Sequence, residues 1–114
     1  MSEAAELLQG TLELLVLKAL SLEPMHGWGI GHRIGQMSAL VFTVPQGSLY
    51  PALQRMLRKG LIRSEWRVTE NSRRARYYLL TPGGRRQLET EIAAWRRASA
   101  AVDGVLSFRL ADGA

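Results

Sequence analysis

The side chains of this sequence that could do chemistry are mainly arginines. Of its 15 basic residues, 13 are Arg and 2 are Lys. Between residues 55 and 97, twelve basic side chains outnumber four acidic ones, a net charge of +8, whereas residues 1–54 carry −2 and residues 98–114 carry −1. Guanidinium groups make forked hydrogen bonds to phosphate and to guanine. A charge run is usually a solvated face, but segregation this strong favours a surface that binds a polyanion.

The other reactive side chains form no catalytic or metal-binding pattern. The chain has no cysteine, which excludes a disulfide framework, a thiol nucleophile and a cysteine zinc site. His26 and His32 are six residues apart, with no acidic residue at ligand spacing. Ser48 follows a glycine but lacks the second glycine of a nucleophile elbow. We therefore expect no enzyme, no cofactor and no metal.

The length and composition fit one globular domain. A chain of 114 residues with 46% hydrophobic and 22% charged residues can bury a core without disulfides. The N-terminus is acidic, so no signal peptide is expected, and no apolar run approaches the ~18 residues of a membrane span. These features favour a cytoplasmic protein with no membrane partner.

Apolar spacing predicts three helices in the first half of the chain. The first two are expected over residues 6–22 and 27–38. In the third, Pro51 has no N–H and should lie in the first turn, which places the start near Ser48, and Gly60 should end the helix in the left-handed conformation. The buried stripe of this third helix consists of Leu49, Ala52, Leu53, Met56 and Leu57.

A β-hairpin should follow the three helices. Apolar and polar residues alternate over residues 62–68, a polar turn follows at 69–73, and residues 74–80 form the return strand. Thr81 as the cap and Pro82 as the first helical residue then begin a last helix. Three helices followed by a hairpin is the order of a winged helix-turn-helix, in which the third helix reads DNA and the hairpin is the wing.

The last helix should extend beyond the domain. Over residues 82–108, at ~1.5 Å per residue, it would be about 40 Å long, too long to be covered by so small a domain. Its apolar residues follow a heptad seam through Ser99, so part of this face should meet another chain. Asp103 and Gly104 leave open whether the helix is continuous. The residues assigned to dimerisation are Leu14, Leu15, Leu88, Ile92, Trp95, Val102 and Leu106.

The expected fold is mainly α with a small β-hairpin. It divides into a winged helix-turn-helix domain at residues 1–81 and a C-terminal dimerisation helix at residues 82–110. Opposite its buried stripe, the third helix exposes Ser48, Tyr50, Gln54, Arg55 and Arg58, and its N-terminus points free N–H groups at phosphate. The residues assigned to DNA are Gln46, Ser48, Tyr50, Pro51, Arg55, Arg73, Arg74 and Arg76.

Several of these positions have a second interpretation. Tyr50 could contact phosphate or pack its ring on the wing, and Arg58 could face the wing or solvent. Trp28, in the second helix, could be a packing residue or a DNA contact. Arg73 and Arg74 are expected on phosphates rather than bases, because half or more of such hydrogen bonds go to the backbone.

Four segments in order resemble the PadR family of bacterial transcriptional regulators: LLQGTLELLVLKAL, MHGWGI, QGSLYPALQRM and RRARYYLLTPGGRRQL. The resemblance covers roughly residues 7–97, and QGSLYPAL is its most specific part. It implies a homodimer that binds a palindromic double-stranded DNA operator, usually as a repressor, and that pairs through one C-terminal helix, as in the compact subgroup. Some members release DNA on binding a phenolic acid or a flat hydrophobic drug. In drug-sensing members an aromatic residue on the last helix stacks the ligand, and Trp95 is the matching position.

Other functions remain open on the sequence. The heptad helix could pair with a different protein in an interaction module, and the basic surface could bind nucleic acid without sequence preference. Trp95 could pack in the dimer core or stack a planar aromatic effector, and both are possible if the dimer leaves a pocket. No pattern in the sequence identifies the operator, the regulated genes or the effector. Only the resemblance favours a repressor over an activator.

Overall fold

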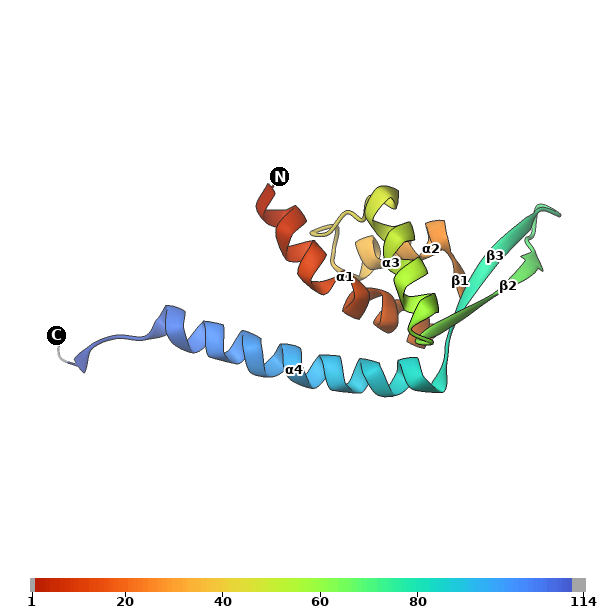
Figure 1. Cartoon of the computed structure of the whole chain (residues 1–114). Helices are drawn as coiled ribbons and strands as arrows, with labels where there is room; N and C mark the ends of the chain where they lie inside the picture. The colour runs from red at the N-terminus through yellow and green to blue at the C-terminus, as the bar shows by residue number, and fades with distance from the viewer. Residues whose placement is uncertain (1, 112–114) are drawn as a thin grey trace.

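The computed structural model describes residues 2–111, with side chains described from residue 11 onward. Three helices, a small antiparallel sheet and a long last helix follow one another (Figure 1), which confirms the predicted fold class. The elements are α1 (Ser2–Leu22), β1 (Met25–His26), α2 (Gly27–Met37), α3 (Gln46–Arg58), β2 (Ile62–Val68), β3 (Arg74–Leu80) and α4 (Pro82–Ser107).

The core lies where α1, α2, α3 and the sheet meet. The predicted stripe of α3 faces this core, and of its members Leu57 alone is only partly buried. α1 begins at Ser2 rather than at residue 6, because Glu3 and the alanines after it are good helix formers that extend the helix backwards. The largest fully buried side chains are Val16, Leu17, Ile30, Ile34, Leu49, Leu53 and Met56.

The start of α3 differs from the prediction. The helix begins at Gln46, not near Ser48, and the N–H groups of Ser48 and Leu49 both donate to the Pro45 carbonyl at 3.0 Å. Pro51 therefore lies in the second turn, where its missing N–H costs one helix hydrogen bond, to the carbonyl of residue 47. The predicted end is confirmed, because Gly60 has a φ of +74° just after the helix.

The sheet has three strands rather than the two expected. β2 and β3 have the predicted bounds and pair antiparallel, while β1 pairs with the other edge of β3, giving the order β1-β3-β2. Met25 lies opposite Tyr78, and His26 lies opposite Tyr77. The added strand ties the wing to the residue that precedes α2, so the two parts of the molecule share one hydrogen-bonded frame.

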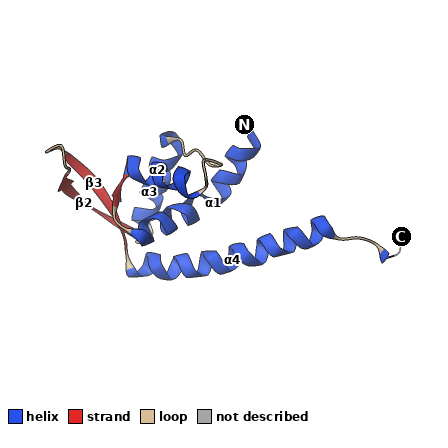
Figure 2. Ribbon diagram, turned by 180° about the vertical axis from the view of Figure 1, so that it is seen from behind, coloured by secondary structure: helices blue, strands red, loops and turns tan. Residues whose placement is uncertain are grey.

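α4 leaves the domain as one long helix (Figures 1 and 2). The Thr81 side chain accepts from the Gly84 N–H at 2.9 Å, and Pro82 is the first helical residue, as predicted. The helix continues through Gly104 and ends at Ser107, three residues short of the predicted 110. The first half of the helix packs on α1. Because the rest of the helix leaves the domain, the chain is elongated and measures 67 × 30 × 20 Å. Among the described residues, no helix has the length and apolarity needed to cross a membrane.

Candidate nucleic-acid interface

The exposed face of α3 lies opposite its buried stripe. Successive helical residues are rotated by ~100°, so positions 47, 51, 54 and 58 fall on one line along the helix. Gly47, Pro51, Gln54 and Arg58 are all exposed there. The first two carry no polar side chain and allow close approach, whereas Gln54 and Arg58 carry the groups that pair with adenine and guanine edges. The sequence pattern predicts Gln54 and Arg58 as exposed but does not assign them to DNA.

The N-terminus of α3 opens onto the same side. Gln46 is exposed and Ser48 is partly buried in the first turn. Within the described chain no side chain caps this helix end. The N–H groups of Ser48 and Leu49 already donate to the Pro45 carbonyl, whereas those of Gln46 and Gly47 have no acceptor inside the helix. They can therefore donate to a phosphate oxygen.

Tyr50 packs against the second helix. A Cβ added at Gly27 would overlap the Tyr50 ring, with the nearest carbon atoms 2.7 and 2.8 Å away. Gly27 is thus the residue that lets the ring lie so close to α2. The side chain of Tyr50 remains 40% exposed, so its ring is held in place while one side stays open to solvent.

A trough of about 350 Å³ runs between the helix-turn-helix and the wing. It brings together Tyr50 of α3, Trp28 of α2 and the three wing arginines predicted to contact DNA: Arg73, Arg74 and Arg76. These residues come from three elements and span almost 50 positions in sequence. The fold therefore gathers four of the eight residues assigned to DNA into one basic, aromatic-lined surface.

Two of the three wing arginines, Arg74 and Arg76, are held over aromatic rings of the hairpin. The register pairs Trp66 with Arg76 and Val68 with Arg74, which puts these side chains on one face. The Arg74 guanidinium lies 4.9 Å from the Trp66 ring centre, and that of Arg76 lies 5.9 Å from the Tyr78 ring centre. Burial raises the pKa of the Tyr78 hydroxyl, against the opposing charge of Arg76, so this hydroxyl stays neutral at physiological pH.

Further contacts fix the wing tip and its other face. Arg76 Nε donates to Ser64 Oγ at 2.9 Å. At the tip, Ser72 adopts a φ of +59° and leaves Arg73 exposed beside it. On the opposite face Arg67 pairs with Glu65 at 2.6 Å, and this hydrogen bond holds the pKa of the Glu65 carboxyl below its usual range. The arginines that face the trough have no acidic partner among the described residues.

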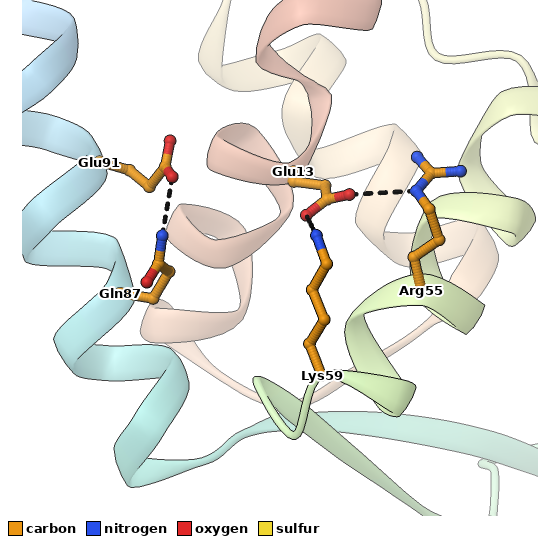
Figure 3. Close-up of polar contacts among 5 residues, drawn as sticks. All are labelled: Glu13, Arg55, Lys59, Gln87 and Glu91. Carbon is orange, nitrogen blue, oxygen red and sulfur yellow. Dashed lines mark hydrogen bonds and ion pairs between the residues drawn. The ribbon is translucent and has the colours of Figure 1, made fainter.

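Arg55 lies away from the outward stripe of α3. Its Nε donates to Glu13 Oε2 of α1 at 3.1 Å, and Lys59 donates to the other oxygen at 3.2 Å (Figure 3). Gln87 and Glu91 of α4 form a neighbouring hydrogen bond of 2.8 Å. A carboxylate 42 residues away in sequence thus draws the Arg55 guanidinium toward α1, while its side chain stays 46% exposed, and the assignment of Arg55 to DNA stays a prediction.

An aromatic stack on α2 has no counterpart in the sequence prediction. Trp28 stacks on His32 with ring centres 4.9 Å apart and is 59% exposed. His26 accepts from the Gly29 N–H at 3.2 Å through Nδ1 and so caps the helix. Trp28 thus packs its ring on a histidine while more than half of its surface stays exposed. It lies at the edge of the trough, on the side that the wing arginines face.

A second hollow lies between α1 and α4, on the other side of the domain. This α1–α4 groove measures about 390 Å³ and is mostly apolar. Four of the residues assigned to dimerisation line it: Leu14, Leu15, Ile92 and Trp95. Leu88 is buried in the core of its own chain, so it has little surface left for a partner. Val102 and Leu106 lie farther out on α4 and are exposed.

Among the described residues there is no group of three His, Cys, Asp or Glu side chains that could hold a metal ion. The basic trough and the outward stripe of α3 carry hydrogen-bond donors, positive charge and exposed rings. That chemistry suits a nucleic acid held by its phosphates and read through its bases.

Comparisons with known proteins agree with this geometry. The sequence model of the family described as "Transcriptional regulator PadR-like family" matches residues 16–90. A PadR family transcriptional regulator from Eggerthella lenta is 30% identical, with 95% of this chain and 92% of that chain covered and a TM-score of 0.81. A PadR-like transcriptional regulator from Bacillus cereus is 28% identical, with 91% and 99% covered and a TM-score of 0.79.

A longer relative is also similar over most of this chain. An uncharacterised 37.1 kDa protein in transposon TN4556 from Streptomyces fradiae is 40% identical over 90 residues, which are 79% of this chain. The match covers 24% of that protein. The chain thus spans about a quarter of the length of this relative.

Proposed function

The chain belongs to the transcriptional regulator PadR-like family, and from that premise we propose that it represses transcription by binding a palindromic operator as a homodimer. It is a regulator with a winged-helix DNA-binding fold and not an enzyme. The observation that supports the proposal best is the trough, which joins Tyr50 of α3 to the three arginines of the wing.

We propose that α3 enters the major groove with its outward stripe facing the bases. Gln54 and Arg58 would then reach base edges, and Gly47 and Pro51 would let the helix approach closely. The N-terminal turn, with Gln46 and Ser48, would lie on a phosphate. Two copies related by a two-fold axis would read half-sites ~34 Å apart or a multiple of that distance.

The wing would follow the adjacent backbone. Arg74 and Arg76 are already held over rings, so they would lose little side-chain freedom on meeting phosphate. Arg73 at the tip could extend into the minor groove. Trp28 and Tyr50 would close the trough from the helix side.

The test is selection of bound DNA from a random pool, followed by sedimentation of the pure protein. We expect the selected DNA to be enriched in a palindrome and the protein to sediment as a dimer at micromolar concentration. An enriched pool without any shared sequence would instead indicate a non-specific nucleic-acid binder. A monomer with no DNA preference would favour the alternative of an interaction module that pairs with a different protein.

We also propose a planar aromatic effector at the α1–α4 groove, because Trp95 lines this groove and is 44% exposed. A flat ring could stack on the indole and lower the affinity for the operator. Planar aromatic compounds should quench tryptophan fluorescence, and Trp95→Phe should remove most of that quenching. Quenching that survives the substitution would place the ligand near Trp28 or Trp66 instead.

A further inference from the structure

We propose that His32 of α2 binds a phosphate of the DNA in its protonated form, so that the affinity for DNA rises as the pH falls from about 8 to about 6. An imidazole takes up its proton over this range, whereas the arginines assigned to DNA keep their charge throughout it. The inference rests on the DNA-binding function proposed above. It adds a contact on α2, outside both the wing and the reading helix.

His32 lines a hollow of about 270 Å³ between α2 and the start of α3, the α2–α3 hollow. Gln46, the first residue of α3, lines the same hollow. Trp28 lines both this hollow and the trough that holds the wing arginines. His32 stacks on Trp28, with ring centres 4.9 Å apart and ring planes inclined by 11°. The stack therefore continues the proposed DNA surface from the trough to the N-terminus of the reading helix.

No carboxylate lines the hollow around His32. The lining residues come from α2, α3 and the segment between them, and His32 is the one titratable group among them. Its sequence neighbour Arg33 is already paired with Glu23 at 2.8 Å. His32 has no ion-pair partner in the described part of the chain. A proton taken up by His32 therefore finds no negative charge in the hollow until DNA supplies one.

Beyond Trp28, the titratable and charged groups that face the stack are those of the trough. They come from β1, α3 and the wing: His26, Tyr50, Arg73, Arg74, Arg76 and Tyr78. No described residue of α1 lines either the trough or the α2–α3 hollow. The surroundings of the stack are thus basic or neutral. A phosphate bound there attracts both the arginines and a protonated His32, so DNA binding and proton uptake favour each other.

The stack also prepares the His32 ring to donate hydrogen bonds. In the described part of the chain, neither ring nitrogen of His32 has a hydrogen-bond partner. A protonated imidazole carries two N–H donors, which suit the oxygens of a phosphate. The face of an indole attracts a cation, so Trp28 can hold the protonated ring in place. A ring already held loses less side-chain freedom when it binds.

The other histidine has a role that requires its neutral form. His26 Nδ1 accepts from the Gly29 N–H at 3.2 Å and caps α2. A proton on Nδ1 would remove this acceptor and weaken the start of the helix. Acid should therefore act in opposite directions at the two histidines of the chain, strengthening DNA binding at His32 and weakening the cap at His26.

The test measures binding to a DNA duplex of random sequence at about pH 6 and about pH 8, at one salt concentration. The wild type should bind more tightly at the lower pH by roughly threefold per chain, or tenfold per dimer, as a partly exposed charge contact provides. His32→Gln should bind weakly at both pH values, and His32→Arg tightly at both. His26→Asn is the matched control, because it keeps a capping oxygen without a titratable ring and should retain the pH dependence.

The salt dependence separates a phosphate contact from an effect on folding. At the lower pH the slope of log K against log salt should be steeper by about 1 per chain, because one more phosphate is neutralised. In His32→Gln the two slopes should be equal. A pH effect on affinity without a change of slope would contradict a phosphate contact at His32.

The remaining outcomes are distinguishable from one another. Equal affinity of the wild type at both pH values would overturn the inference and leave the DNA-binding function intact. A pH dependence that persists in His32→Gln would assign it to another group and overturn the inference as well. No binding of the folded protein to this duplex or to any selected sequence, at either pH, would instead remove the function proposed above.

Discussion

The wing and the outer half of α4, residues 93–107, are both largely exposed, but they differ in what their side chains touch. In the wing, Arg74 and Arg76 lie over rings, and Arg76 also donates to Ser64. In the outer half of α4, Val102 and Leu106 are 54% and 78% exposed. Charged groups ordered by their own chain are ready for a hydrated polyanion. Apolar groups left in water gain free energy only when another protein surface covers them. One region is thus complete in a single chain, and the other is not.

Removing the apolar face of the outer half tests this contrast most severely. Val102→Asp combined with Leu106→Asp should raise the dimer dissociation constant by roughly a thousandfold or more, because each buried apolar side chain contributes ~1.5–3 kcal/mol and symmetry doubles the loss. Sedimentation velocity measures the change, and the circular dichroism of the winged domain should be retained. Ala101→Asp, on the outward side of the helix, is the control. If the double variant dimerises as tightly as the wild type, the outer half of α4 does not need a partner surface and the contrast with the wing is wrong.

Substitutions in the wing should change the affinity for DNA and its salt dependence, but not dimerisation. Arg73→Ala with Arg74→Ala should weaken binding to every DNA by about 10- to 100-fold and reduce the slope of log K against log salt by up to ~2. Titrations at several salt concentrations measure both effects. Arg67→Ala, on the other face and paired with Glu65, should change neither. An unchanged slope in the double variant would remove the wing from the interface.

Base reading should be separable from phosphate binding within α3 itself. Gln54→Ala should cost about 1–3 kcal/mol against the preferred base pair and relax the preference at that position. Arg55→Ala is the matched control, because Arg55 pairs with Glu13 and does not lie on the outward stripe. Binding to operators altered at one base pair at a time measures the preference. A preference lost with Arg55 and kept without Gln54 would reverse our placement of the reading face.

The smallest effect is expected at the ion pairs that tie α3 to α1. Glu13→Gln should lower the free energy of unfolding by less than ~1 kcal/mol, because Arg55 and Lys59 are exposed partners. Urea denaturation measures the change, with Glu23→Gln, which breaks the exposed pair to Arg33, as a control of similar kind. A loss of several kcal/mol would mean that this pair supports the fold much more than its exposure implies.

The elements were predictable where a regular pattern covers several residues. The alternation over 62–68 and 74–80 gave both long strands their bounds, and Thr81 with Pro82 marked the start of α4. β1 has two residues and borders a helix, so it has no periodicity to detect. The start of α3 was misplaced because Pro51 was read as a first-turn residue, whereas the structure accepts it in the second turn.

The candidate site was predictable in composition but only partly in arrangement. The basic segment and the wing arginines follow from residue type. The different surroundings of Arg55 and Gln54 do not follow from residue type, because both are polar neighbours on one helix. The carboxylate of Glu13, which accepts a hydrogen bond from Arg55, is distant in sequence. The exposed stack of Trp28 on His32 likewise follows from no pattern in the sequence.

Because α4 continues without a break through Gly104, its length fixes both the position and the direction of the apolar side chains at its far end. Each residue inserted between its first half and its outer half would advance the tip by ~1.5 Å and turn the apolar side by ~100°. Insertions of about seven or eleven residues, close to two or three whole turns, would bring that side back to within about 20° of its original direction. In the proposed dimer, the spacing of the two reading domains on DNA could therefore change only in coarse, phased steps.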